Sequence, residues 1–173
     1  MMARNHVLTS LVLTNAGLMV FPSFYTIGTN SYAIFLSGII LGSLFCDVDE
    51  EHSYIGRRFQ FISLPLNRII GHRTLTHNIF PYITLLFCAF YYSSNFLLGF
   101  GIGAIFHILE DSITNNGVNW AITPLSRKFV LLPKKMRFQT NGNVENFFYS
   151  PLITMILAYQ TYVLFERFLH EVL

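Results

Sequence analysis

The sequence predicts an all-α, multi-pass membrane protein with about five transmembrane helices. Hydrophobic residues make up 53% of the 173 residues and charged residues only 12%, whereas a soluble domain has about a quarter of its residues charged. The uncharged residues are also gathered into long stretches, which a lipid-facing helix requires because unpaired ions are costly inside a bilayer. No repeat or low-complexity tract divides the chain, so we treat residues 1–173 as one domain.

Three stretches contain no Asp, Glu, Lys or Arg. They follow Arg4, Arg73 and Glu145 and are 42, 36 and 20 residues long. A transmembrane helix needs about 20 predominantly apolar residues. The first two stretches can therefore each hold a helical hairpin, and the third can hold a single helix.

The first stretch is interrupted by Pro22 and Gly28, which favour turns. We therefore expect helices over Val7–Val20 and Tyr32–Cys46. A charge before the first apolar run, at Arg4, is also typical of a signal peptide. No small-residue cleavage site follows, so we expect this segment to stay in the protein.

The second stretch is interrupted at Ser93-Ser94-Asn95, which leaves helices over Asn78–Tyr92 and Phe96–Leu109. The third stretch gives a fifth helix over Pro151–Phe165. Several of these segments have only about 15 residues, so a soluble all-helical core with buried hairpins is an alternative. Helices that extend into the headgroup region, or a locally thinner bilayer, would reconcile the short segments with a membrane. Cys46 and Cys88 lie in apolar runs, and we expect no disulfide framework.

The basic residues predict the orientation. Lys and Arg gather in the cytoplasmic loops of membrane proteins. With five spans, ten of the eleven lysines and arginines fall on one side and only Arg167 on the other. We therefore expect a cell inner (cytoplasmic) membrane protein whose large loops lie in the cytoplasm.

This topology places seven candidate metal ligands together at the cytoplasmic ends of the spans: His6, Asp47, Asp49, His72, His77, His107 and Asp111. Imidazole and carboxylate suit zinc, and manganese and magnesium are alternatives. Seven ligands exceed the three or four of one catalytic zinc, so they would fit a two-ion site with a bridging aspartate. A lone histidine near a membrane surface is usually a satisfied polar residue, but four of the six histidines converge here.

Residues of the fourth span recur every four positions and share one helical face: Gly99, Gly103, His107 and Asp111. Gly38 and Gly42 have the same spacing in the second span, so these two helices are expected to pack closely through their glycines. Such packing would bring the acidic residues that follow the second span toward the fourth. The alternative is ordinary helix packing without any site.

The segment from Gly71 to His77 reads Gly-His-Arg-Thr-Leu-Thr-His. Residues five apart on a helix point about 140° away from each other. His72 and His77 can therefore serve one site only if a helix begins between them, with Thr74 or Thr76 as its N-cap.

Together these motifs resemble the YdjM family, and the resemblance extends from His6 to about residue 150. It rests on Asp47-Val48-Asp49, Ser53 to Arg58, Gly71-His72-Arg73 with Thr76-His77, His107 with Asp111, Gly117-Val118-Asn119-Trp120, and Thr140-Asn141-Gly142 with Glu145. The Gly-His-Arg-x-x-Thr-His element is the most specific part. Two departures are Asn78, where the family often has Ser, and the Glu50-Glu51 pair, where many members place a histidine.

The resemblance implies an inner-membrane-associated, metal-dependent hydrolase, under LexA control in some members. A distant similarity of the family to zinc-dependent phospholipase C and to related nucleases implies phosphodiester hydrolysis. Arg73 is the predicted catalytic cation, because guanidinium binds phosphate in a bidentate manner, although it could instead anchor the loop or pair with an aspartate. Asp47 or Asp111 could act as general base.

The expected substrate is a lipid or lipid-linked phosphate, because the ligands lie at the level of the headgroups. Nucleic acid is less expected, since few aromatic residues interleave with the basic cluster. Two alternatives stay open, a non-catalytic metal-binding or structural membrane protein and a nuclease-like phosphodiesterase. Metal transport is disfavoured because the spans lack charged residues near the bilayer centre.

Overall fold

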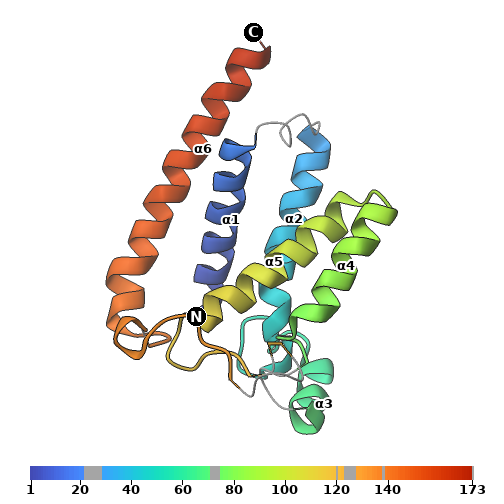
Figure 1. The fold of residues 1–173 in the computed structure, drawn as a ribbon, viewed down its shortest axis with the longest axis vertical. Coiled ribbons are helices and arrows are strands. Elements are labelled where there is room, and N and C mark those ends of the chain that lie inside the picture. The colour runs from blue at the N-terminus through green and yellow to red at the C-terminus, as the bar shows by residue number, and fades with distance from the viewer. Residues whose placement is uncertain (22–28, 71–74, 120, 123–127, 138, 173) are drawn as a thin grey trace.

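The structure is a computed structural model that describes residues 1–21, 29–70, 75–119, 121–122, 128–137 and 139–172. Its elements are α1 (Ala3–Val20), α2 (Thr29–Phe45), η2 (Cys46–Asp49), α3 (Gln60–Ile70), α4 (Ile79–Tyr91), α5 (Asn95–Ser112), η3 (Lys134–Met136), η4 (Val144–Tyr149) and α6 (Ser150–Val172). Within these ranges the β pairing is limited to an isolated bridge between Val118 and Phe129. The all-α class is therefore confirmed (Figure 1).

Each of the five predicted spans is a helix, and the helices correspond to α1, α2, α4, α5 and α6. The predicted turn between the second pair is also present, since Ser94 caps α5 by accepting a hydrogen bond from the Leu97 amide. The sequence did not indicate α3, a short helix in the loop that follows α2. Its apolar side chains Phe61 and Ile69 are exposed.

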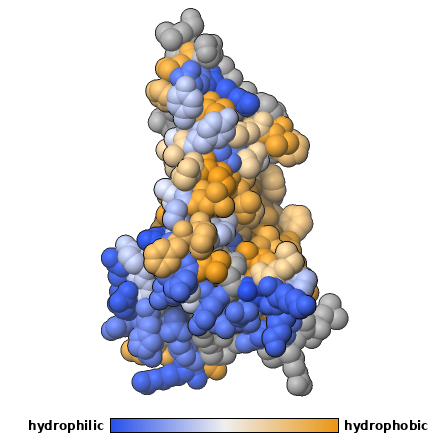
Figure 2. All heavy atoms as spheres, turned by 90° about the vertical axis from the view of Figure 1, so that its left-hand side faces the viewer, coloured by the Kyte–Doolittle hydropathy of each residue, from blue (hydrophilic) through white to orange (hydrophobic). Residues whose placement is uncertain are grey.

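Two stretches of the described chain are long and apolar enough to cross a bilayer, Ser31–Asp49 and Val144–Arg167. The helix Ile79–Tyr91 is apolar but shorter. The prediction of five spans is therefore not confirmed, although the helices themselves are present. Figure 2 shows hydrophilic residues gathered at the lower end of the molecule and mostly hydrophobic residues on the helices above them.

The closest helix pair is α2 with α5, and glycines make its approach possible. A Cβ atom at Gly38 or Gly42 would collide with the α5 backbone near Phe96 and Phe100, and one at Gly99 or Gly103 would collide with the α2 backbone. The predicted packing through glycines is confirmed. It sets the distance between the ends of both helices, where the candidate ligands lie.

A methyl group added at this interface should destabilise the protein. We expect Gly103→Ala to lower the free energy of unfolding by about 1–3 kcal/mol, because overpacking forces backbones apart. Gly17→Ala is the matched control, since a Cβ at Gly17 meets no atom within 4 Å and alanine favours the helix. Thermal unfolding in detergent measures both variants. Equal midpoints would show that the glycines do not set the spacing.

The helix ends that carry candidate ligands meet at one end of the bundle. In Figure 1 the N-terminal ends of α1, α4 and α6 and the C-terminal ends of α2 and α5 all lie near the bottom. α5 contacts α1, α2 and α4, and α6 packs against α1. These helix ends therefore lie together, as the predicted topology required.

Candidate metal centre

Five of the predicted ligands come together at this end of the bundle. They are His6 in the first turns of α1, Asp47 in η2, His77 just before α4, and His107 and Asp111 near the end of α5. The histidines and Asp111 are almost wholly buried, whereas the side chain of Asp47 is 17% exposed. Asp47 is therefore the member of the cluster most accessible from outside.

Two histidine nitrogens lie close to the same two aspartate oxygens. The Nε2 atom of His77 lies 3.9 Å from Asp47 Oδ1 and 3.8 Å from Asp111 Oδ2. The Nε2 atom of His107 lies 3.6 Å and 4.0 Å from the same two oxygens. Ligands held about 2.0–2.2 Å from a tetrahedral zinc lie roughly 3.3–3.6 Å from each other, so small side-chain movements would complete such a site.

His6 extends the cluster on the other side of Asp111. Its Nε2 atom lies 3.3 Å from Asp111 Oδ1, and its ring stacks on that of His107 with 3.7 Å between the ring centres. Asp111 thus directs one oxygen toward His6 and the other toward the remaining histidines. This is the geometry that a bridging aspartate of a two-ion site requires.

Backbone and carboxylate groups orient the two stacked histidines. His107 Nδ1 donates to the carbonyl of Ser43 over 2.6 Å, and His6 Nδ1 lies 2.7 Å from Glu110 Oε2. Neither Nε2 atom has a hydrogen-bond partner among the residues described. A hydrogen bond at Nδ1 fixes the tautomer and the orientation of the imidazole ring. Proteins use such bonds to direct Nε2 toward a metal.

Asp49 occupies a different position from the one predicted. It accepts a hydrogen bond from Thr76 Oγ1 over 2.5 Å and lies 3.8 Å from His77 Nδ1, on the side of the ring away from Asp47. Two groups of donor atoms lie close enough to hold an ion, one from His6, His107 and Asp111 and one from Asp47, His77 and His107, and Asp49 belongs to neither. Its place is that of a residue that positions His77.

The N-terminal segment places a positive charge beside Asp111, and hydrogen bonds hold the start of α1 in place. The Met1 ammonium donates to Asp111 Oδ1 over 2.5 Å, so a cation lies against this carboxylate. Glu145, in η4, accepts hydrogen bonds from the Met2 amide and the Asn5 side chain and so fixes the start of α1.

His6 and Glu110 lie just outside the predicted spans, and burial affects the pKa of both. Burial disfavours the imidazolium, but the adjacent Asp111 and Glu110 carboxylates outweigh it and raise the pKa of His6 to about 9. Burial raises the pKa of Glu110 to about 7. A metal ion would have to displace the proton of His6, so binding should weaken as the pH falls.

Two further predictions concern the segment before α4. His72 and Arg73 lie outside the described residues, as does Thr74. The predicted N-cap is wrong, because α4 begins after His77 and Asn78 caps it by accepting from the Phe80 amide. The Thr76 hydroxyl instead donates a hydrogen bond to Asp49.

Sequence reasoning missed Glu110 and the Ser43 carbonyl. Glu110 is three residues from His107 and so falls near the same helical face, which was a usable signal. The carbonyl offers no signal in the sequence. His52, which was left out of the site, is 82% exposed and lies beside Glu51.

Comparisons with known proteins identify the family. The family model described as YdjM inner membrane protein matches residues 1–169. Inner membrane protein YdjM of Escherichia coli (strain K12) and that of Shigella flexneri are each 34% identical over 106 residues, 56% of this chain and 54% of theirs. The match thus spans about half the length of these curated relatives. The uncharacterized protein YvsG of Bacillus subtilis (strain 168) is 28% identical over 144 residues, 82% of this chain and 86% of its own. No solved structure matches.

Proposed function

This chain belongs to the YdjM family of inner membrane proteins, and from that premise we propose that it is a membrane-bound, metal-dependent hydrolase of phosphoester bonds. The proposed substrate is a lipid or lipid-linked phosphate, cleaved at the cytoplasmic face. One observation carries the proposal. The Nε2 atoms of His77 and His107 each lie 3.6–4.0 Å from Asp47 Oδ1 and Asp111 Oδ2 in a largely buried cluster of histidines and acids.

The residues present fit a divalent ion, with zinc preferred. Imidazole nitrogens and carboxylate oxygens are its usual ligands, and the unsatisfied Nε2 atoms of His6 and His107 face the centre. His77, His107 and Asp111 would hold one ion and leave a position open for water, and His6 with the second oxygen of Asp111 could take part in holding another. When bound, such an ion acts as a Lewis acid that lowers the pKa of water and stabilises charge on phosphoryl oxygens.

The side chains around the centre have different proposed roles in the reaction. Asp47 is partly exposed, so it is placed to accept a proton from the attacking water. The water oxygen bonds to phosphorus, the ester P–O bond breaks, and the departing alkoxide takes up a proton. Glu110, Ser43 and Asp49 position the histidines.

Arg4 is a cation in the first turn of α1, and its Nη2 atom donates to Ser150 Oγ over 3.3 Å. Arg4 lines a groove of about 520 Å³ together with Val7, Leu44 and Tyr54. Val7 follows His6, and Leu44 follows Ser43, so this groove lies next to the cluster. Arg4 is thus a candidate to bind the phosphoryl oxygens, as is the predicted Arg73.

Metal analysis and an activity assay test this function together. Protein purified without chelator should contain stoichiometric divalent metal and should release phosphate or a phosphorylated headgroup from phospholipid. A chelator should abolish the activity, and zinc should restore it. Stoichiometric metal without turnover of lipid or nucleic acid would favour the binding-protein alternative, and turnover of nucleic acid alone would favour the nuclease. Absence of metal would remove the centre.

A further inference from the structure

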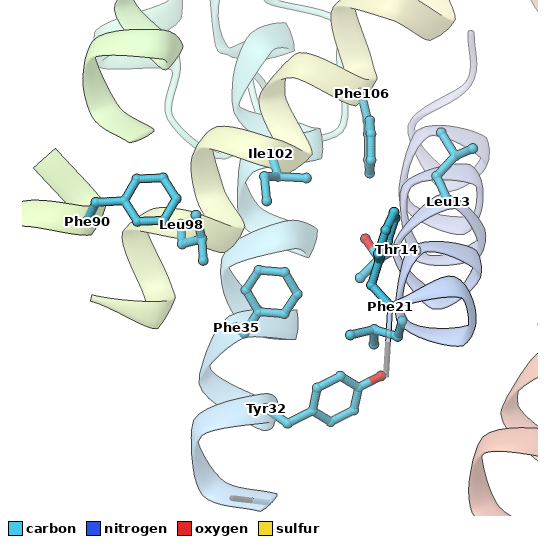
Figure 3. Close-up of a pocket in the computed structure, with 11 residues that line it drawn as sticks. Leu13, Thr14, Phe21, Tyr32, Phe35, Phe90, Leu98, Ile102 and Phe106 are labelled. Carbon is cyan, nitrogen blue, oxygen red and sulfur yellow. The ribbon is translucent and has the colours of Figure 1, made fainter. Parts of the chain in front are cut away.

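An apolar cavity of about 280 Å³ lies between α1, α2 and α5, and none of its lining residues belongs to the metal centre. Figure 3 shows Leu13, Phe35 and Ile102 facing this space, with Phe90 of α4 at one side. From these observations we propose that the cavity binds one acyl chain of a bilayer phospholipid whose phosphate is presented to the centre. This inference rests on the proposed function and adds to it the means of holding the substrate.

The lining leaves nothing for a polar ligand to bind. It contains two polar side chains, and each has a partner inside the protein. Thr14 Oγ1 donates to the Ser10 carbonyl over 2.7 Å, and the Tyr32 hydroxyl donates to Asn15 Oδ1 over 3.3 Å. An occupant must therefore be hydrocarbon, because a polar group would lose its hydrogen bonds there.

The cavity opens at the surface of the protein. Among its lining residues, Leu13 is 42% exposed, Phe21 59% and Phe90 70%. In a family of inner membrane proteins this surface meets acyl chains, so a chain can enter from the side.

The cavity and the centre share two helices. Along α1, Leu13 is seven residues beyond His6, or about 10 Å at 1.5 Å per residue. Along α5, Ile102 is five residues before His107, or about 8 Å. These separations match the path from the phosphate of a phospholipid, through its glycerol, to the first part of an acyl chain.

Gly17 allows the proposal to be tested without disturbing the centre. It lines the cavity, and a Cβ at this position meets no atom within 4 Å. Gly17→Phe should therefore fill the cavity, whereas Gly17→Ala should leave it open. Met155→Phe is a matched control, because Met155 is 70% exposed on α6 and does not line the cavity.

Photolabelling with phosphatidylglycerol that carries a diazirine in one acyl chain tests occupancy without any need for activity. We expect labelled peptides from α1, α2 and α5 in the unmodified protein, in Gly17→Ala and in Met155→Phe, and at least a tenfold loss in Gly17→Phe. Labelling spread evenly over α6 and the other lipid-facing helices, or unaffected by Gly17→Phe, would overturn the proposal.

Kinetics separate this inference from the function on which it rests. If the protein hydrolyses phosphoesters, Gly17→Phe should lower the ratio of long-chain phospholipid to water-soluble bis(p-nitrophenyl) phosphate hydrolysis by about tenfold or more. An unchanged ratio would contradict the cavity as a substrate site and leave the hydrolase intact. If the unmodified protein hydrolyses neither substrate, the proposed function is wrong, and the labelling result alone decides whether the cavity holds a chain.

Discussion

The double substitution His107→Ala and Asp111→Ala should remove bound divalent metal, with at least a hundredfold loss of affinity. His107 contributes to both groups of donor atoms, and Asp111 directs an oxygen to each side of the cluster. Loss of both leaves no complete set of three ligands for an ion, which catalytic zinc sites need. Elemental analysis of the purified variant and titration with zinc measure the effect.

A matched control comes from the exposed His52 and Glu51, whose side chains lie 3.4 Å apart. The pair His52→Ala and Glu51→Ala removes the same kinds of group from the surface and should keep the metal content unchanged. Helicity by circular dichroism verifies that the first variant is folded, and Asp111→Asn serves in its place if it is not. Full metal retention in a folded His107 and Asp111 variant would rule out this centre.

Glu110→Gln should weaken metal binding by about 10- to 100-fold, the usual effect of losing a carboxylate that orients a ligand histidine. Glu110 Oε2 lies 2.7 Å from His6 Nδ1. The neutral amide keeps the shape of the side chain, so the fold should persist. Competition with a chromogenic chelator measures the affinity.

The pH dependence of metal affinity distinguishes a Glu110 that positions His6 from a Glu110 that only fills space in the core. In the unmodified protein the affinity should rise with pH until His6, whose pKa is about 9, has lost its proton. Removing the Glu110 charge removes one group that raises this pKa, so the rise should end at a lower pH in Glu110→Gln. Ser10→Ala, which deletes a hydrogen bond to Glu110 Oε1, should cause a smaller change. An unaltered pH profile in Glu110→Gln would contradict the positioning role.

Much of the architecture followed from where charges are absent. The uncharged stretches located five helices, and the turn predicted at Ser93-Ser94-Asn95 is present. The turn predicted at Pro22 and Gly28 lies outside the described residues. The uncharged stretches did not fix the number of membrane crossings. Backbone hydrogen bonding decides whether a segment is helical, whereas the length and apolarity of the helix decide whether it can cross a bilayer. The sequence did not predict α3, because this helix is short and lies in a loop with several charges. Its amphipathic pattern covers too few residues to stand out there.

The sequence predicted most of the residues that form the cluster but not the role of each one. Topology alone brought His6, His77, His107 and Asp111 to one end of the bundle, as observed. The aspartates of Asp47-Val48-Asp49 divided between two roles because η2 turns tightly there. Residues two apart on a 3₁₀ turn point to different sides, so Asp47 faces the cluster and Asp49 lies behind His77.

The ligand set draws on chain segments from residue 6 to residue 111, in α1, η2, the approach to α4, and α5. If the proposed centre binds an ion, none can be held during biosynthesis until α5 has formed and paired with α2. Such an ion, binding only the assembled bundle, would stabilise it by mass action. Its supply in the cell would then affect how long newly made copies survive proteolysis.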